Sequence, residues 1–170
     1  MGARNLEFEI EEAQVTEEVV ETRPKPFNFL SVLFTLSLLI TSTKLFSASY
    51  LTLKSMYSPE IFVSMTLTFN ELYQRVVFSA YIFEIALSAI FASLYIFNFY
   101  SAIKRKKGMK NIFLMTQGTY LCIVVTYNFL VNKYLGSEFQ TGLVLSNALY
   151  LGLWYSYLNY SERAKSVFTA

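Results

Sequence analysis

The sequence predicts an all-α integral membrane protein, a bundle of four transmembrane helices with both termini in the cytoplasm. Four stretches without a charged residue, 26–43, 85–103, 111–132 and 139–161, fill about half of the 170-residue chain. A hydrocarbon core about 30 Å thick takes about 20 residues of helix to cross, and a helix pairs every backbone group inside the lipid. Hydrophobic residues make up 54% and charged residues only 15% of the chain, less charge than soluble domains carry.

The distribution of basic residues predicts the orientation. Four spans place Lys44, Lys54, Arg75 and Lys133 on one side of the membrane and the rest of the 14 on the other. The side with more basic residues has Arg4, Arg23, Lys25, Lys104, Arg105, Lys106, Lys107, Lys110, Arg163 and Lys165. By the positive-inside rule, both termini and the loop 104–110 are cytoplasmic.

The N-terminal segment, residues 1–26, differs in composition from the rest of the chain. Its acidic residues include Glu7, Glu9, Glu11, Glu12, Glu17 and Glu18. Leu6, Phe8 and Ile10 alternate with the first glutamates in a strand pattern, but one isolated strand has nothing to pair with. We expect a flexible cytoplasmic tail. The alternative is a strand or helix that forms on a membrane or cytoplasmic protein partner.

The transmembrane domain is expected over residues 27–170, with helices at about 27–47, 77–103, 111–133 and 141–160. An outer loop, 48–76, separates the first two helices. Within it, residues 60–69 are apolar but too short to span. This segment is expected either to lie at the membrane surface or to cap the bundle from outside.

Lys44 and Glu84 are charges at the edge of the apolar stretches. Lys44 lies about 27 Å of helix beyond Pro26, and Glu84 about 30 Å before Lys104, so both are expected near the outer face. One interpretation is an ion pair between the first two helices, because an unpaired charge in lipid is costly. The others are that each side chain reaches water separately, or that the two form a proton relay.

Polar residues recur at helical spacing in three of the stretches and are expected to meet inside the bundle. Interhelical hydrogen bonds are one interpretation, and a polar cavity for a small molecule or ion is the other. Together with Lys44 and Glu84, the intramembrane candidates are Ser88, Tyr95, Asn98, Gln117, Tyr120, Asn147 and Tyr150.

The composition excludes several chemistries. The chain has no His, no Asp and a single Cys, Cys122, which excludes an internal disulfide, a His or Cys zinc cluster and a His-based triad. We expect no catalytic residue, metal or other cofactor. The net charge of +2 is too small to indicate a nucleic acid.

Six residues near the C-terminus stand at a distinctive spacing: Trp154, Tyr157, Ser161, Arg163, Lys165 and Phe168. They resemble the closing signature of the family called domain of unknown function 2569, in which Trp and Tyr are followed by Ser-x-Arg-Val-Lys-x-Thr-Phe. Ala164 and Val167 depart from it. The likeness covers residues 83–168. Two motifs of the family are missing from this chain: the Gly-Gly-Trp-Leu at the start of the first helix, and the Phe-Pro after the basic loop. The resemblance implies a small multi-pass protein of the bacterial cytoplasmic (inner) membrane, and implies no activity.

The residues of this tail and of the basic loop also have a direct physical interpretation. We expect them to anchor the protein at the inner interface, with the basic side chains on anionic lipid headgroups and Phe168 dipping into the membrane. The expected anchors are Trp154, Tyr157, Ser161, Arg163, Lys165, Phe168, Lys104, Arg105, Lys106 and Lys107.

The sequence therefore favours a non-enzymatic membrane protein that acts through protein or lipid contacts, as an accessory subunit or in envelope maintenance. The alternative is a small transporter or channel subunit with a polar intramembrane cavity. Its expected partners are the lipid bilayer and a protein bound by the acidic tail.

Overall fold

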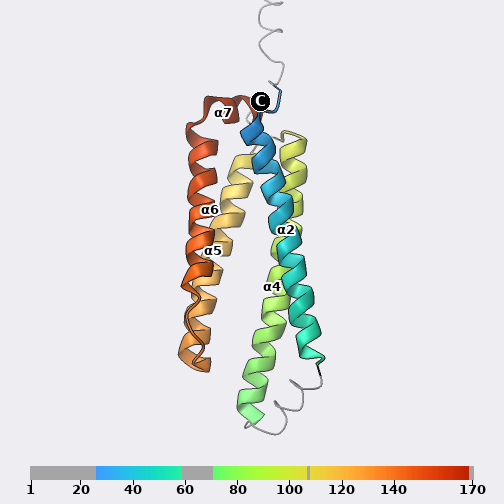
Figure 1. The fold of residues 1–170 in the computed structure, drawn as a ribbon, viewed down its shortest axis with the longest axis vertical. Coiled ribbons are helices and arrows are strands. Elements are labelled where there is room, and N and C mark those ends of the chain that lie inside the picture. Colours follow the sequence, from blue (N-terminus) through green and yellow to red (C-terminus); the bar gives the residue numbers. More distant parts are fainter. Residues whose placement is uncertain (1–25, 59–70, 107, 169–170) are drawn as a thin grey trace, which may run out of the picture.

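The chain is all-helical in a computed structural model that describes residues 26–58, 71–106 and 108–168. The four long helices are α2 (Phe29–Met56), α4 (Glu71–Ile103), α5 (Met109–Leu135) and α6 (Thr141–Tyr160), and α7 (Glu162–Phe168) is short. Figure 1 shows the long helices side by side in an elongated bundle, with α7 lying across the end where α2 begins. The predicted acidic tail up to residue 25 and the predicted surface segment 60–69 lie outside the described residues.

Three of these helices are long and apolar enough to cross a membrane: α2, residues Gln74–Ile103 of α4, and α5. Their outward faces carry exposed aliphatic side chains, such as Ile40 (55% exposed) and Ile90 (57%). Apolar surface this extensive is unusual on a protein in water and is expected against lipid. The described chain thus has the character of a multi-pass membrane protein.

The first two long helices both extend into the segment that was predicted to be an outer loop, 48–76. α2 continues to Met56 and α4 already begins at Glu71, whereas the predicted 141–160 agrees with α6 at both ends. Lys44 ends a charge-free stretch but does not end a helix, because Lys, Leu and Met are good helix formers. The helix stops only where Tyr57 and Ser58 turn before Pro59.

The first helix is fixed at its beginning by Asn28. The Asn28 side-chain Oδ1 accepts a hydrogen bond from the Ser31 backbone N–H at 2.8 Å, which caps the N-terminus of α2. The Tyr157 hydroxyl of α6 donates to the same oxygen at 3.2 Å. One polar atom therefore caps α2 and ties it to α6.

Helix α7 was not predicted from the sequence. Ser161 ends α6, and its Oγ accepts from the Ala164 backbone N–H at 3.2 Å, so it caps α7. This short helix turns the last residues back across the bundle, and Ala164, Val167 and Phe168 become buried. A Ser followed by Glu is the sequence signal that predicts such a start.

The core is concentrated at the end of the bundle where α7 lies, which we call the closed end. Phe34 of α2 is fully buried there and packs edge-on against Phe113 of α5, Trp154 of α6 and Phe168 of α7, with ring centroids 5.1, 5.0 and 5.7 Å away. Aromatic pairs in this geometry add about 0.5–1.5 kcal/mol each beyond the burial of their area. The four elements are thus joined around one ring.

We predict that Phe34→Ala destabilises the protein by about 3–5 kcal/mol, because it leaves a cavity where four elements meet. Leu36→Ala is the matched control, since Leu36 lies on the same helix and is 47% exposed. Thermal unfolding in detergent measures both changes. Similar losses for the two variants would contradict a core centred on Phe34.

Candidate functional site

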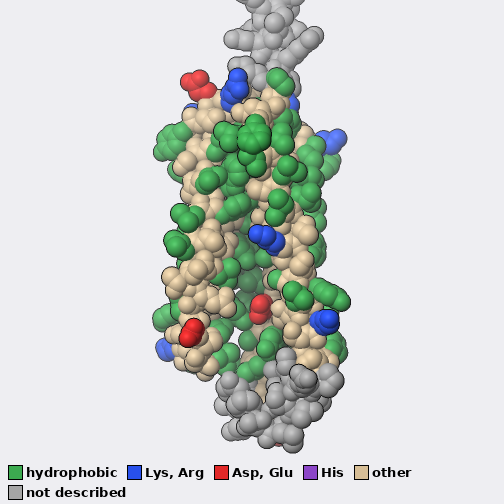
Figure 2. All heavy atoms as spheres, viewed as in Figure 1, with side chains coloured by type: hydrophobic (Ala, Val, Ile, Leu, Met, Phe, Trp, Pro, Cys, Tyr) green, Lys and Arg blue, Asp and Glu red, His purple; other side chains and the backbone are tan. Residues whose placement is uncertain are grey.

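A cavity of about 840 Å³ lies between the four long helices, in the half of the bundle away from α7, which we call the open end. Each long helix contributes to its wall. Figure 2 shows a recess in this half, between the α6 side and the α2 side of the bundle, with an acidic side chain visible in it. The sequence-predicted residues that line it are Lys44, Glu84, Ser88, Tyr120, Asn147 and Tyr150.

Lys44 and Glu84 both reach this cavity, but they do not pair, and the described part of the chain contains no ion pair between them. Two hydrogen bonds fix the relative depth of α2 and α4: Ser42 Oγ donates to the Ala92 carbonyl at 2.9 Å and Ser49 Oγ to the Ile85 carbonyl at 3.5 Å. Because the helices are antiparallel, Lys44 is level with about residue 90 of α4. Glu84 lies about six residues, or about 9 Å, farther toward the open end.

The interpretation that Lys44 and Glu84 form an ion pair is therefore wrong, because the structure keeps the two charges apart. The prediction assumed that Pro26 and Lys104 mark the same depth. The same two hydrogen bonds place Lys104 level with about residue 30 instead, because packing sets where the helices cross. The Glu84 carboxylate is half-buried and Lys44 is exposed on the cavity wall. Within the described residues, neither has a hydrogen-bonding or ionic side-chain partner.

Three predicted residues from three helices form one chain of hydrogen bonds beside the cavity. The Tyr95 hydroxyl of α4 donates to Gln117 Oε1 of α5, and Gln117 Nε2 donates to the Asn147 carbonyl of α6 at 3.3 Å. Tyr95 and Gln117 are fully buried, whereas Asn147 lies on the cavity wall. This chain fixes the depth of α6 against α4 and α5.

Asn98 lies one turn nearer the closed end and is also fully buried. Its Nδ2 donates to Thr116 Oγ1 at 3.2 Å, which adds a second polar contact between α4 and α5. Its Oδ1 and the Ser101 Oγ are buried without a hydrogen-bond partner. Asn98 therefore belongs to the packing of the closed end and not to the cavity.

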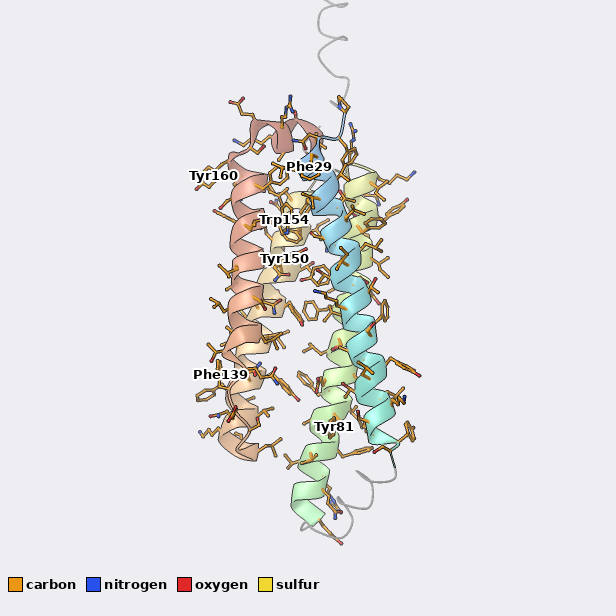
Figure 3. All side chains as sticks on the ribbon, viewed as in Figure 1. Phe29, Tyr81, Phe139, Tyr150, Trp154 and Tyr160 are labelled. Carbon is orange, nitrogen blue, oxygen red and sulfur yellow. The ribbon has the colours of Figure 1, made fainter. Side chains whose placement is uncertain are left out.

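Tyr150 closes the cavity toward the closed end. Figure 3 shows Tyr150 and Trp154 between α6 and α2. The Tyr150 hydroxyl shares a hydrogen bond with Ser37 Oγ at 2.9 Å, and its ring packs 6.3 Å from Trp154 and 6.2 Å from Phe113. Farther along, Tyr157 shares a hydrogen bond with Ser31 Oγ at 2.8 Å. The cavity is thus blind at this end, because aromatic rings fill the space between α2 and α6.

The serines of α2 that form these hydrogen bonds were not among the predicted site residues. Ser31 and Ser37 bond to α6, while Ser42 bonds to α4. Small hydroxyl residues recur along this otherwise apolar helix, and that recurrence is a signal for close helix packing in lipid. The sequence contained the signal, but it does not say which neighbour each serine contacts.

Several expected interface anchors occupy other positions. Trp154, Tyr157 and Phe168 are 7%, 9% and 1% exposed, so they are core residues of the closed end and not side chains directed at lipid headgroups. For Trp154 and Tyr157 the physical reason is packing against Phe34 and Ser31 of α2. Phe168 is buried because α7 folds it back against Phe27 and Phe34. Ser161 acts as the cap of α7.

The basic anchors remain at the surface of the closed end. Lys104, Lys106, Arg163 and Lys165 are exposed, while Lys107 lies outside the described residues. Arg105 is half-buried, with its guanidinium 4.6 Å from the centre of the Phe27 ring. Lys106 similarly lies 5.0 Å from the centre of the Tyr100 ring. Such cation–π contacts contribute about 0.5–1 kcal/mol at exposed sites.

The described residues contain no group of three or more His, Cys, Asp or Glu side chains that could hold a metal ion. Cys122 is exposed on α5 and does not line the cavity. The polar groups of the cavity are a carboxylate, an ammonium, hydroxyls and amides. They can bind a charged or polar molecule.

Comparisons with family models, with curated proteins and with solved structures find no match to this chain.

We predict that Lys44→Met and Glu84→Gln have additive effects on thermal stability in lipid-free detergent, within about 0.5 kcal/mol, because the two groups do not touch and no bound lipid connects them. The control cycle is Tyr95→Phe with Gln117→Leu, whose members share a hydrogen bond and should couple by at least that amount. Strong coupling between Lys44 and Glu84 would mean that they form an ion pair in the folded protein.

Proposed function

We propose that this chain is a four-span membrane protein with both termini in the cytoplasm, and that it acts by binding a ligand in the cavity at its open end. The observation that carries the proposal is the cavity of about 840 Å³, which has Lys44 and Glu84 on its wall and is closed by aromatic rings toward α7. Unpaired charges inside a membrane are costly and mark functional sites.

The fourth span is α6, whose 20 residues measure about 30 Å. With its tyrosines and asparagines, α6 does not reach the hydropathy by which the other three helices are identified as candidate spans. Leu145, Leu149 and Leu153 nevertheless form an exposed face, at 56%, 64% and 60%. Its polar residues Asn147 and Tyr150 face the cavity instead. Leucine side chains on the outer face and polar groups on the inner face are what is expected of a bundle helix that contacts lipid, which supports α6 as the fourth span.

The orientation is supported by the charges at the two ends. The closed end has the basic loop after α4 and the basic residues of α7, and the positive-inside rule favours the cytoplasm for it. The open end then faces outward. With the C-terminal resemblance to the domain of unknown function 2569 family, this supports a place in a bacterial inner membrane. An accessory role, with the acidic tail on a protein partner, remains compatible with it.

Binding of a cationic group is supported by the Glu84 carboxylate. In the part of the chain that the structure describes, this carboxylate makes no hydrogen bond and no ion pair, and Tyr120 and Tyr127 of α5 lie close enough to interact with it electrostatically. Such a group is suited to attract a cation.

A transporter or channel subunit is the second candidate, favoured by the same cavity. Conduction requires a path through both ends of the bundle. Phe34, Phe113 and Trp154 occupy the path toward α7, which supports a binding site open on one side.

We predict that reporter fusions at Gly108, in the α4–α5 connection, and at Ala170 both read cytoplasmic. A fusion at Ser137, in the α5–α6 connection, should read outside, since α5 crosses between Gly108 and Ser137. Alkaline phosphatase and green fluorescent protein fusions measure the two sides. A cytoplasmic Ser137 fusion would contradict a spanning α5–α6 hairpin.

We predict that the purified protein in liposomes releases neither trapped potassium nor trapped carboxyfluorescein above the level of protein-free liposomes, because its closed end is blocked. A pore-forming peptide provides the positive control. Robust and selective flux would contradict the binding proposal and favour a transporter or channel subunit.

A parallel pull-down with the acidic tail as bait tests whether that tail binds a protein partner.

A further inference from the structure

Lys44 and Glu84, which no described side chain pairs with, differ in the sign of their charge and in their depth in the cavity. Glu84 lies nearer the open end, and Lys44 lies about 9 Å deeper along the helices, as the hydrogen bonds of Ser42 and Ser49 require. A ligand that pairs with both charges needs a cationic group near Glu84, toward the open end, and an anionic group near Lys44, deeper in the cavity. This requirement is stricter than that of a site with a single charge.

The cavity also offers an apolar surface close to these charges. Leu45 of α2, Leu87 of α4 and Val124 of α5 line it, together with Leu143 of α6. Tyr81, Tyr120 and Tyr127 add rings with a hydroxyl. A small hydrophilic ion would leave these side chains without a partner. The wall therefore fits an amphiphile that has both a charged head and a hydrocarbon part.

The recess faces sideways. Figure 2 shows it on the flank of the bundle, between α6 and α2, and not only at the end. The hydrogen bonds between α2 and α6 involve residues 28, 31 and 37 of α2, all nearer the closed end than Lys44. Farther along, α2 and α6 diverge around the cavity. In a bilayer, this opening gives acyl chains direct access.

We infer that the ligand is a zwitterionic phospholipid with a primary ammonium, taken from the outer leaflet, whose phosphate binds Lys44 and whose ammonium binds Glu84. This inference rests on the proposed binding function and names its ligand class. The order of the charges supports it, because in such a lipid the ammonium follows the phosphate on the side away from the acyl chains. The lipid neutralises both charges at once.

The test measures lipid retention by native mass spectrometry after the protein is taken from nanodiscs of defined composition. Phosphatidylethanolamine has both charges, whereas phosphatidylglycerol has the phosphate without the ammonium. The wild-type protein should retain the first at least about fivefold over the second. Glu84→Gln should remove that preference, whereas Lys44→Met should lower retention of both lipids, because both have the phosphate. Lys44→Arg should retain the lipids as the wild type does, since Arg also binds phosphate.

Two further variants separate this inference from the proposed function. Ala48→Trp places a large side chain in the cavity and should abolish retention of both lipids, whereas Ile40→Ala, on the outward face of α2, should retain them as the wild type does. If Ala48→Trp retains lipid normally, the cavity is not a binding site and the proposed function fails. If only Ala48→Trp changes retention, while Lys44→Met retains both lipids at the wild-type level and Glu84→Gln keeps the wild-type preference, the cavity binds lipid but the assigned headgroup contacts are wrong.

Competition with glycerophosphoethanolamine distinguishes a lipid from its free headgroup. This soluble compound has the same two charges and no acyl chains. It should fail to displace the retained lipid at millimolar concentration, because the apolar wall contributes to binding. Full displacement would overturn the assignment to a membrane lipid in favour of a soluble zwitterion.

Discussion

The contact of Phe34 with rings from three other elements is the interaction on which the rest of the structure depends. It joins α2 to α5, α6 and α7 at one point, and Phe34 is fully buried there. Association of helices in lipid has no hydrophobic driving force, so packing and polar contacts have to hold the bundle together. Concentrating large rings at one end makes that end rigid and leaves α2 and α6 free to diverge at the other.

The cavity is a consequence of this uneven packing. Hydrogen bonds of Ser31 and Ser37 hold α2 against α6 only near the aromatic cluster, and the buried contact of Tyr95 with Gln117 holds α4 against α5. Beyond them, polar side chains on the four helices face a common space. Lys44 and Glu84 each bear a charge there that no other described side chain neutralises. A ligand that bears both charges would neutralise them.

The all-helical fold and the polar faces of α4, α5 and α6 could be predicted from the sequence, because they depend on local patterns. Spacing alone placed Gln117 and Asn147 on inward faces. The structure buries Gln117, whose amide donates to the Asn147 backbone carbonyl, and places Asn147 on the cavity wall. The limits of α6 followed from its charge-free length. In contrast, the relative depth of Lys44 and Glu84 depends on how α2 packs against α4. That depth is set by contacts such as Ser42 with Ala92, which no periodicity reveals.

The aromatic residues show a second limit of sequence reasoning. Trp and Tyr near the end of a membrane helix occur both at the lipid interface and in protein cores. Trp154 and Tyr157 belong to the core because α2 packs against them, through Phe34 and Ser31. Which helix packs there depends on tertiary contacts that the spacing of these residues does not show. The expected headgroup contacts are left to the exposed Lys104, Lys106, Arg163 and Lys165.

Cysteine accessibility tests most directly whether the bundle is closed at one end and open at the other. In a Cys122→Ser background, Ser88→Cys places a thiol on the cavity wall, Ser101→Cys places one in the buried closed end, and Ser55→Cys is an exposed reference near the end of α2. The account predicts that a membrane-impermeant maleimide, added from outside, labels residues 88 and 55 and leaves residue 101 unlabelled. Labelling of residue 55 alone would contradict an accessible cavity, and labelling of residue 101 would contradict the closed end.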